Sequence, residues 1–89
     1  MLQFRWNDWN REHATRHGVS PREAEAVVRG ARAPFPRRVD RTTWLVQGRG
    51  VSGRFVQVCY LVDDDGTLYI IHARPLTDSE KRRYRRRRP

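Results

Sequence analysis

The side chains best suited to chemistry in this sequence lie in one stretch, residues 68–84, and are His72, Arg74 and Tyr84. An imidazole can move a proton near neutral pH, and a guanidinium offers paired hydrogen bonds to phosphate oxygens. His72 and Arg74 follow an apolar run that is typical of a strand, and Tyr84 lies one or two helical turns beyond a corner. The combination indicates a site for an anionic ligand. The alternative interpretation is structural, with His72 capping the strand and Arg74 pairing with an acid.

Two further arginines, Arg49 and Arg54, flank the glycine-rich segment 48–53. Antiparallel strands can bring these strand-end residues and Arg74 toward one rim of a sheet, where three guanidinium groups would form a phosphate clamp. RNA carries its own nucleophile, the 2′-hydroxyl group, so a site that cleaves RNA needs cations on the non-bridging oxygens and two proton-transfer groups, but no metal. The alternative is that each arginine is a surface residue paired with an acid.

Other kinds of site are weakly supported. His13 and His17 are four residues apart and could share one helix face, but no third histidine or cysteine has a matching spacing for a metal. The single cysteine, Cys59, lies in an apolar pattern that predicts a buried, inert thiol. The segment 48–53 joins two expected strands, so it lacks the helix N-terminus of a phosphate-binding loop. We therefore expect neither a metal nor a cofactor.

Length and composition predict one small α+β domain over residues 1–89, with hydrophobic residues at 37% and charged residues at 33%. The formal net charge is +9, and residues 81–89 contribute +7 of it, with Lys81 and six arginines and no acid. Such a basic tail indicates contact with nucleic acid, and Lys81, Arg82 and Arg85 are its candidate phosphate-binding residues. The alternative is a solvated, disordered end.

No stretch has the roughly 18 to 20 apolar residues that a membrane span needs, and the N-terminus lacks the profile of a signal peptide. These features predict a cytoplasmic protein that does not contact membranes.

Helix signals are concentrated in the first third of the chain. Asn7 or Asp8 can cap a first helix that runs to about residue 17, and Gly18 then ends it in the left-handed conformation. Ser20 and the proline after it mark the start of a second helix, which stops near Gly30. The segment 31–40 has two prolines and no usable period, which favours a loop or an edge segment.

Three apolar runs follow, at residues 43–47, 55–62 and 67–73. The connections between them are short and contain glycine, so they predict antiparallel neighbours in a meander of three strands, with four strands as the alternative. One face of the sheet should pack against the helices while the other stays partly exposed to solvent. The polar side chain of Gln57 indicates which face is the exposed one. Thr77 and Glu80 form a capping box, which predicts a C-terminal helix.

Several blocks of residues occur together in the order typical of one family. The first runs from Asn7 through the segment 16–20, and later blocks are Gly48 with Arg49, Gly53 with Arg54, and the segment 73–84. This ordered set resembles BrnT-type toxins of bacterial type II toxin–antitoxin systems, in the RelE/ParE superfamily. It covers residues 4–84.

The resemblance implies a RelE-like fold and a metal-independent endoribonuclease that inhibits growth by cutting RNA, without a cofactor. It also implies a bacterial cytoplasmic protein with a cognate BrnA-like antitoxin, through which the complex binds operator DNA. By position, Arg54 and Arg74 are the leading site residues, Arg49 and Tyr84 follow, and His17 has a structural or supporting role. His72 replaces a small residue of the family, and either His72 or Tyr84 would move a proton.

Two alternatives to a ribonuclease remain open. The chain could be a non-catalytic module that holds nucleic acid with its basic tail, or a toxin-derived subunit that serves complex formation and promoter repression. The tail could also be the surface that an acidic segment of the antitoxin covers.

Overall fold

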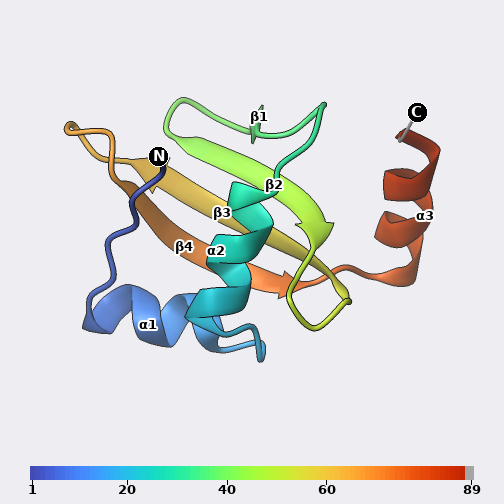
Figure 1. The fold of residues 1–89 in the computed structure, drawn as a ribbon, viewed down its shortest axis with the longest axis horizontal. Coiled ribbons are helices and arrows are strands. Elements are labelled where there is room, and N and C mark those ends of the chain that lie inside the picture. The colour runs from blue at the N-terminus through green and yellow to red at the C-terminus, as the bar shows by residue number, and fades with distance from the viewer. Residues whose placement is uncertain (88–89) are drawn as a thin grey trace.

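The structure, a computed structural model, describes residues 1–87. It is an α+β protein with an antiparallel four-stranded sheet in the order β1-β2-β3-β4 and with helices at both ends of the chain (Figure 1). The elements are α1 (Asp8–Thr15), α2 (Pro21–Arg29), β1 (Arg37–Arg38), β2 (Thr43–Arg49), β3 (Phe55–Val62), β4 (Leu68–Pro75) and α3 (Asp78–Arg87).

The sheet confirms the predicted meander and adds a short fourth strand at its edge. The segment 31–40 was predicted to be either a loop or an edge segment. It contains the edge strand β1, which pairs with β2. The hairpin glycines Gly53 and Gly66 both have φ of +89°, the left-handed conformation that favours glycine. β2 and β4 each extend about two residues past their predicted ends, because backbone pairing continues to Arg49 and Pro75.

The two N-terminal helices begin where their capping signals predict. The side chain of Asn7 accepts a hydrogen bond from the backbone of Asn10 at the start of α1, and Ser20 caps α2 in the same way. α1 ends at Thr15, two residues before the predicted end, and Gly18 follows with φ of +83°. α2 ends at Arg29, with Gly30 as its C-cap, next to the predicted end.

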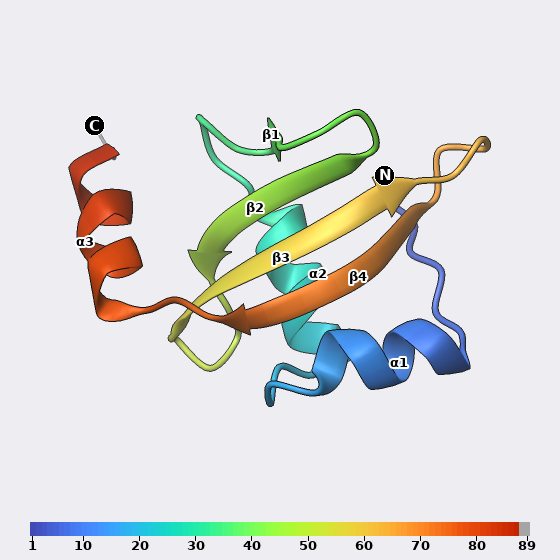
Figure 2. The same ribbon diagram turned by 180° about the vertical axis from the view of Figure 1, so that it is seen from behind.

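Both helices lie on one side of the sheet, and the core fills the space between. Its fully buried members include Val46, Val56, Val58 and Ile70 from the strands. Figure 2 shows the opposite face of the sheet, over which none of the described helices lies. Gln57 is on that face and pairs in register with Gln47 and Arg74. The predicted arrangement of one packed and one partly open face is therefore confirmed.

The basic C-terminal segment is helical as far as the structure describes it. The capping box is confirmed, because the backbone N–H of Glu80 donates to Thr77 Oγ1 while the N–H of Thr77 donates to Glu80 Oε1. Tyr84 is only 8% exposed, and its ring packs against Phe35 and Phe55. Residues 88–89, the end of the predicted tail, lie outside the described residues. Among residues 1–87, no helix has both the length and the apolar character needed to cross a membrane.

Candidate functional site

Arg54 is held by the loop and helix that precede it in the chain. Its Nη2 donates to Glu23 Oε1 at 2.9 Å and its Nε to Glu23 Oε2 at 3.2 Å, while Nη2 also donates to the carbonyl oxygen of Gly18 at 2.7 Å. Ser52 Oγ donates to the same carboxylate at 2.6 Å. The hydrogen bond from the Arg54 guanidinium holds the pKa of the Glu23 carboxyl below its usual value. Burial acts in the opposite direction, but its effect is smaller. Arg54 is therefore fixed beside the turn that follows α1.

Arg74 also pairs with a carboxylate, which belongs to Glu80 of the C-terminal helix α3. Its Nη1 and Nη2 donate to the two carboxylate oxygens of Glu80 at 2.7 and 2.8 Å, and Nη1 also reaches the carbonyl oxygen of Pro75 at 3.1 Å. These hydrogen bonds lower the pKa of Glu80 to about 2. The side chain of Arg74 stays 28% exposed. α3 is thus tied to the end of β4 through the arginine that the sequence marks as a site residue.

The third predicted member of the clamp, Arg49, lies over an aromatic ring. Its guanidinium carbon is 4.6 Å from the centroid of Phe55, and that of Arg85 is 5.7 Å from the same ring. Tyr84 packs on Phe55 as well, with centroids 5.3 Å apart. Arg54 and Arg74 are therefore each paired with an acid, as the structural interpretation expects, whereas the recorded partner of Arg49 is an aromatic ring.

The structure brings together two histidines that are far apart in the sequence. The rings of His17 and His72 meet edge to face, with centroids 5.5 Å apart and planes at 67°. His17 follows α1 in the turn whose Gly18 carbonyl oxygen binds Arg54, and His72 precedes Arg74 by two residues on β4. Two imidazoles in contact, with the Arg74 guanidinium near one of them, supply the kinds of group that proton transfer at a phosphate requires.

The pKa of the His72 imidazole lies below its usual value. Burial is the largest cause, and the nearby His17 and Arg74 lower it further. His72 is therefore a neutral imidazole near pH 7, the form that can accept a proton. Sequence reasoning placed His72 at the site but gave His17 only a supporting role. No spacing signal links the two, because their contact depends on how α1 packs against β4.

Comparisons with protein-family models, with curated proteins and with solved structures found no match to this chain. What the site can do therefore follows from its own geometry and chemistry.

The other histidine, His13, is engaged locally. Its Nδ1 donates to the carbonyl oxygen of Trp9 at 2.7 Å, and its ring stacks on that of Trp9 with centroids 4.0 Å apart. Among residues 1–87, no group of three or more histidine, cysteine or acidic side chains could hold a metal ion. Cys59 on β3 is only partly buried, so the predicted full burial is not observed, although burial still raises the pKa of its thiol.

The predicted phosphate-binding residues of α3 differ in their exposure. Arg82 and Arg85 are exposed, whereas Lys81 is half-buried and lies 3.7 Å from Asp78 in an ion pair one turn away. Tyr84, on the same helix, faces inward. It also lines a cavity of about 230 Å³ between α2, the β2–β3 hairpin and α3, together with Arg32 and Arg49. α3 therefore presents arginines outward and anchors itself with one tyrosine.

Proposed function

We propose that this protein is a metal-independent endoribonuclease, the toxin of a type II toxin–antitoxin pair with a RelE-like fold. The observation that carries the proposal is the contact between His17 and His72 beside Arg74. It supplies two proton-transfer groups next to a cation, which is what cleavage of RNA through its own 2′-hydroxyl needs. The ordered set of BrnT-like residues supports the same assignment.

In the proposed reaction His72 takes the proton from the 2′-hydroxyl as its oxygen attacks the adjacent phosphorus. The bond from phosphorus to the 5′-oxygen breaks, and the protonated ring of His17 gives that oxygen its proton. The products are a 2′,3′-cyclic phosphate and a 5′-hydroxyl end. The reaction consumes no metal or external reactant. Afterwards His72 returns its extra proton to water and His17 takes one up from water, which restores both rings.

The arginines bind and stabilise the charge that builds on the phosphate. The contacts of Arg54 use Nε and Nη2, and those of Arg74 use Nη1 and Nη2, so Nη1 of Arg54 and Nε of Arg74 are available to phosphate oxygens. The carboxylates of Glu23 and Glu80 keep both guanidinium groups oriented before the substrate binds. Preorganised donors of this kind stabilise a transition state without reorganising. In this assignment Arg49 holds the RNA backbone near the hairpin, and Tyr84 packs beneath it.

The test is cleavage of RNA in vitro, together with growth of bacteria that express the protein. His17→Ala and His72→Gln should each lower cleavage by about 100-fold or more, since a general acid or base contributes about 10² to 10⁴. Arg74→Ala should have a comparable effect, whereas Arg41→Ala, a matched exposed arginine in the β1–β2 turn, should not. Equal cleavage by the wild type and both histidine variants would overturn the proposal.

A second candidate function has its own observation. α3 stands beyond the end of the sheet in both ribbon views (Figures 1 and 2). Its exposed side chains include Arg82, Arg83, Arg85 and Arg86. Such a helix suits the binding of nucleic acid without cleavage, or the docking of an acidic segment from a BrnA-like antitoxin that carries the complex to operator DNA.

The two roles of α3 can be separated by experiment. Nucleic-acid binding through α3 should weaken steeply as salt rises, and Arg82→Ala with Arg85→Ala should reduce that salt dependence. Antitoxin docking predicts that the same double variant fails to pull down the product of the adjacent reading frame. If the double variant keeps both the salt-dependent binding of nucleic acid and the capture of the partner, α3 has neither role.

A further inference from the structure

A small cavity lies between α2, the β2–β3 hairpin and α3, and neither histidine of the proposed catalytic pair lines it. Its volume is about 230 Å³, and its lining includes two arginines and an apolar wall: Arg32, Arg49, Val27, Gly48, Phe55 and Tyr84. No acidic side chain among residues 1–87 lines this cavity. It therefore combines two positive charges with apolar surface.

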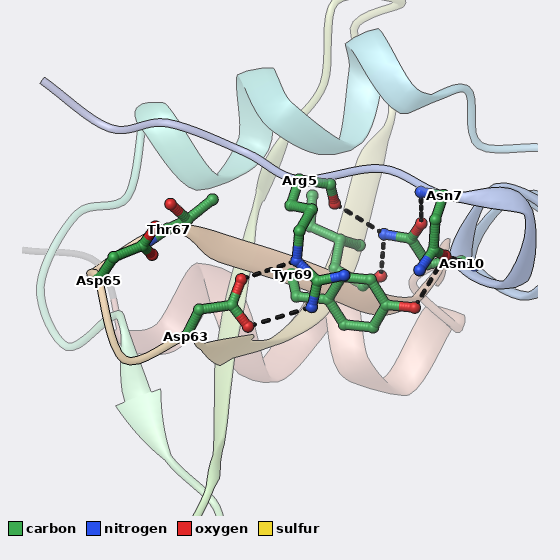
Figure 3. Close-up of polar contacts among 8 residues, drawn as sticks. Arg5, Asn7, Asn10, Asp63, Asp65, Thr67 and Tyr69 are labelled. Carbon is green, nitrogen blue, oxygen red and sulfur yellow. Dashed lines mark hydrogen bonds and ion pairs between the residues drawn. The ribbon is translucent and has the colours of Figure 1, made fainter.

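The two arginines of the cavity differ from the other arginine that lies over an aromatic ring. The guanidinium carbon of Arg5 is 4.0 Å from the centroid of Tyr69, and its Nε and Nη2 also donate to Asp63 at 2.8 and 3.1 Å (Figure 3). Arg49 lies over a ring in the same way. In the part of the chain that the structure describes, however, neither Arg49 nor Arg32 forms an ion pair with a carboxylate.

The acids of the two helices beside the cavity already pair with other cations. Each lies within ion-pair distance of a different basic residue: Glu23 of Arg54, Glu25 of Arg29, Asp78 of Lys81 and Glu80 of Arg74. Two guanidinium groups on one small cavity repel each other, and an anion bound between them lowers that repulsion. The charge of the cavity thus favours a negatively charged ligand from outside the chain.

A terminal phosphate suits this cavity better than other common anions. A phosphate monoester has a charge of about −1.5 to −2 near neutral pH, which balances two arginines, and its oxygens accept paired hydrogen bonds from each guanidinium. A carboxylate or an internal phosphodiester has only one charge. Arg85 adds positive charge, because its guanidinium carbon lies 5.7 Å from the centroid of the Phe55 ring in the cavity wall.

We propose that this cavity binds a phosphate monoester, held by Arg32 and Arg49, at the 5′ end of an RNA strand or on a free nucleotide. The cavity is smaller than the roughly 300–1,000 Å³ of sites that enclose a whole drug-sized ligand, so the base stays outside and its identity has little effect. The site uses neither histidine and requires no cleavage. Arg32 belongs to this site alone, and it is therefore the residue to vary.

The test compares two 5′ ends of a 2′-O-methyl oligonucleotide, which cannot be cleaved because it lacks the nucleophile. Anisotropy titrations of the 3′-labelled strand at fixed salt should give about a 10-fold lower Kd with a 5′-phosphate than with a 5′-hydroxyl group. Arg32→Gln should reduce this preference to below about twofold, because it removes one of the two charges. Arg22→Gln removes the same charge from an exposed position at the other end of α2 and should keep the preference.

Calorimetric titration with adenosine 5′-monophosphate distinguishes the two sources of the phosphate. Binding that Arg32→Gln abolishes, without a preference between the oligonucleotide ends, assigns the site to a free nucleotide. A preference between the ends without binding of the mononucleotide assigns it to the end of a strand. Either result supports a site for a phosphate monoester, and the methyl ester of the nucleotide, with a single charge, should bind more weakly.

Equal Kd values for the two ends together with no Arg32-dependent binding of the mononucleotide would overturn the site, as would a preference that Arg32→Gln leaves intact. Tighter Arg32-dependent binding of a polyglutamate peptide than of the mononucleotide would overturn it in favour of a protein ligand. Cleavage of ordinary RNA without a phosphate preference would overturn this site and keep the nuclease, whereas a preference without cleavage would do the reverse. Circular dichroism of each variant verifies that the fold is retained.

Discussion

The carboxylate of Glu80 lies 2.7 and 2.8 Å from two guanidinium nitrogens of Arg74, and it also accepts a hydrogen bond from the backbone N–H of Thr77 at 2.9 Å. One side chain therefore caps α3, fixes its start to the end of β4 and orients an arginine of the candidate site. Stability and site geometry are coupled at this point.

Glu80→Gln should lower the free energy of unfolding by about 2 kcal/mol, because the neutral amide has one acceptor oxygen in place of two and so loses the ion pair with the partly buried Arg74 guanidinium. Chemical unfolding followed by circular dichroism measures the loss. Asp78→Asn is the matched control: its carboxylate is 89% exposed and pairs with Lys81 at the surface, so the change should be below about 0.5 kcal/mol. A loss of equal size in both variants would contradict the assigned role of Glu80.

Stability should fall in acid because of the same ion pair. The pKa of Glu80 in the folded protein is about 2, against an ordinary value of 4.5, so the unfolded chain takes up its proton first as the pH falls. The stabilisation is complete above about pH 4.5 and is lost progressively toward pH 2. Unfolding free energies measured across this range should decline more steeply for the wild type than for Glu80→Gln. Parallel curves would argue against the pair.

Gly50 is predicted to be intolerant of a side chain although its backbone is unstrained. A Cβ atom there would lie 2.5 Å from Glu23 Oε2, and moving that carboxylate breaks its contacts with Arg54 and Ser52. Gly50→Ala should destabilise the fold by about 2 kcal/mol or more. Gly53→Ala, where a Cβ meets nothing but φ is +89°, should cost only about 1 kcal/mol. The reverse order in unfolding experiments would contradict this account.

Asn10 is expected to be the costliest polar residue to remove from α1. It is fully buried, donates to the carbonyl oxygens of Arg5 and Ile70, and accepts from the backbone N–H of Asn7. Asn10→Ala leaves these groups unpaired and should cost about 2–3 kcal/mol. The variant should also weaken RNA cleavage, because α1 positions His17. Arg11→Ala, an exposed neighbour on the same helix, provides the control.

His72 should lose its proton below pH 6.5, because burial, His17 and Arg74 all lower its pKa. As the proposed general base it must be neutral, so cleavage should rise with pH through a midpoint below 6.5. Titration of the His72 ring by NMR measures the same midpoint without catalysis. His17→Ala should raise this midpoint, because the nearby His17 is one of the groups that lower the pKa of His72. A midpoint above 6.5 in the wild type would contradict the assignment.

The sequence by itself determined the local structure of this protein. Helix starts at Asn7, Ser20 and Thr77, and turns at Gly53 and Gly66, depend on hydrogen bonds or backbone angles within a few residues, so short patterns predict them. The alternation along β3 also predicted one packed and one open face. The sequence did not predict the last two residues of β2 and β4, because the end of a strand depends on how far its partner strand continues to pair with it.

Only the tertiary structure decided what surrounds the candidate site residues. The sequence marked Arg54 and Arg74, but it could not show that carboxylates from two different helices, Glu23 and Glu80, hold them. Nor could it join His17 to His72, or expose Trp9 while burying Tyr84. Such contacts are fixed by the packing of α1 and α3 against the sheet, and that packing depends on the summed burial of many side chains rather than on any local spacing. The sequence thus supplied the chemical groups, and the fold selected their partners.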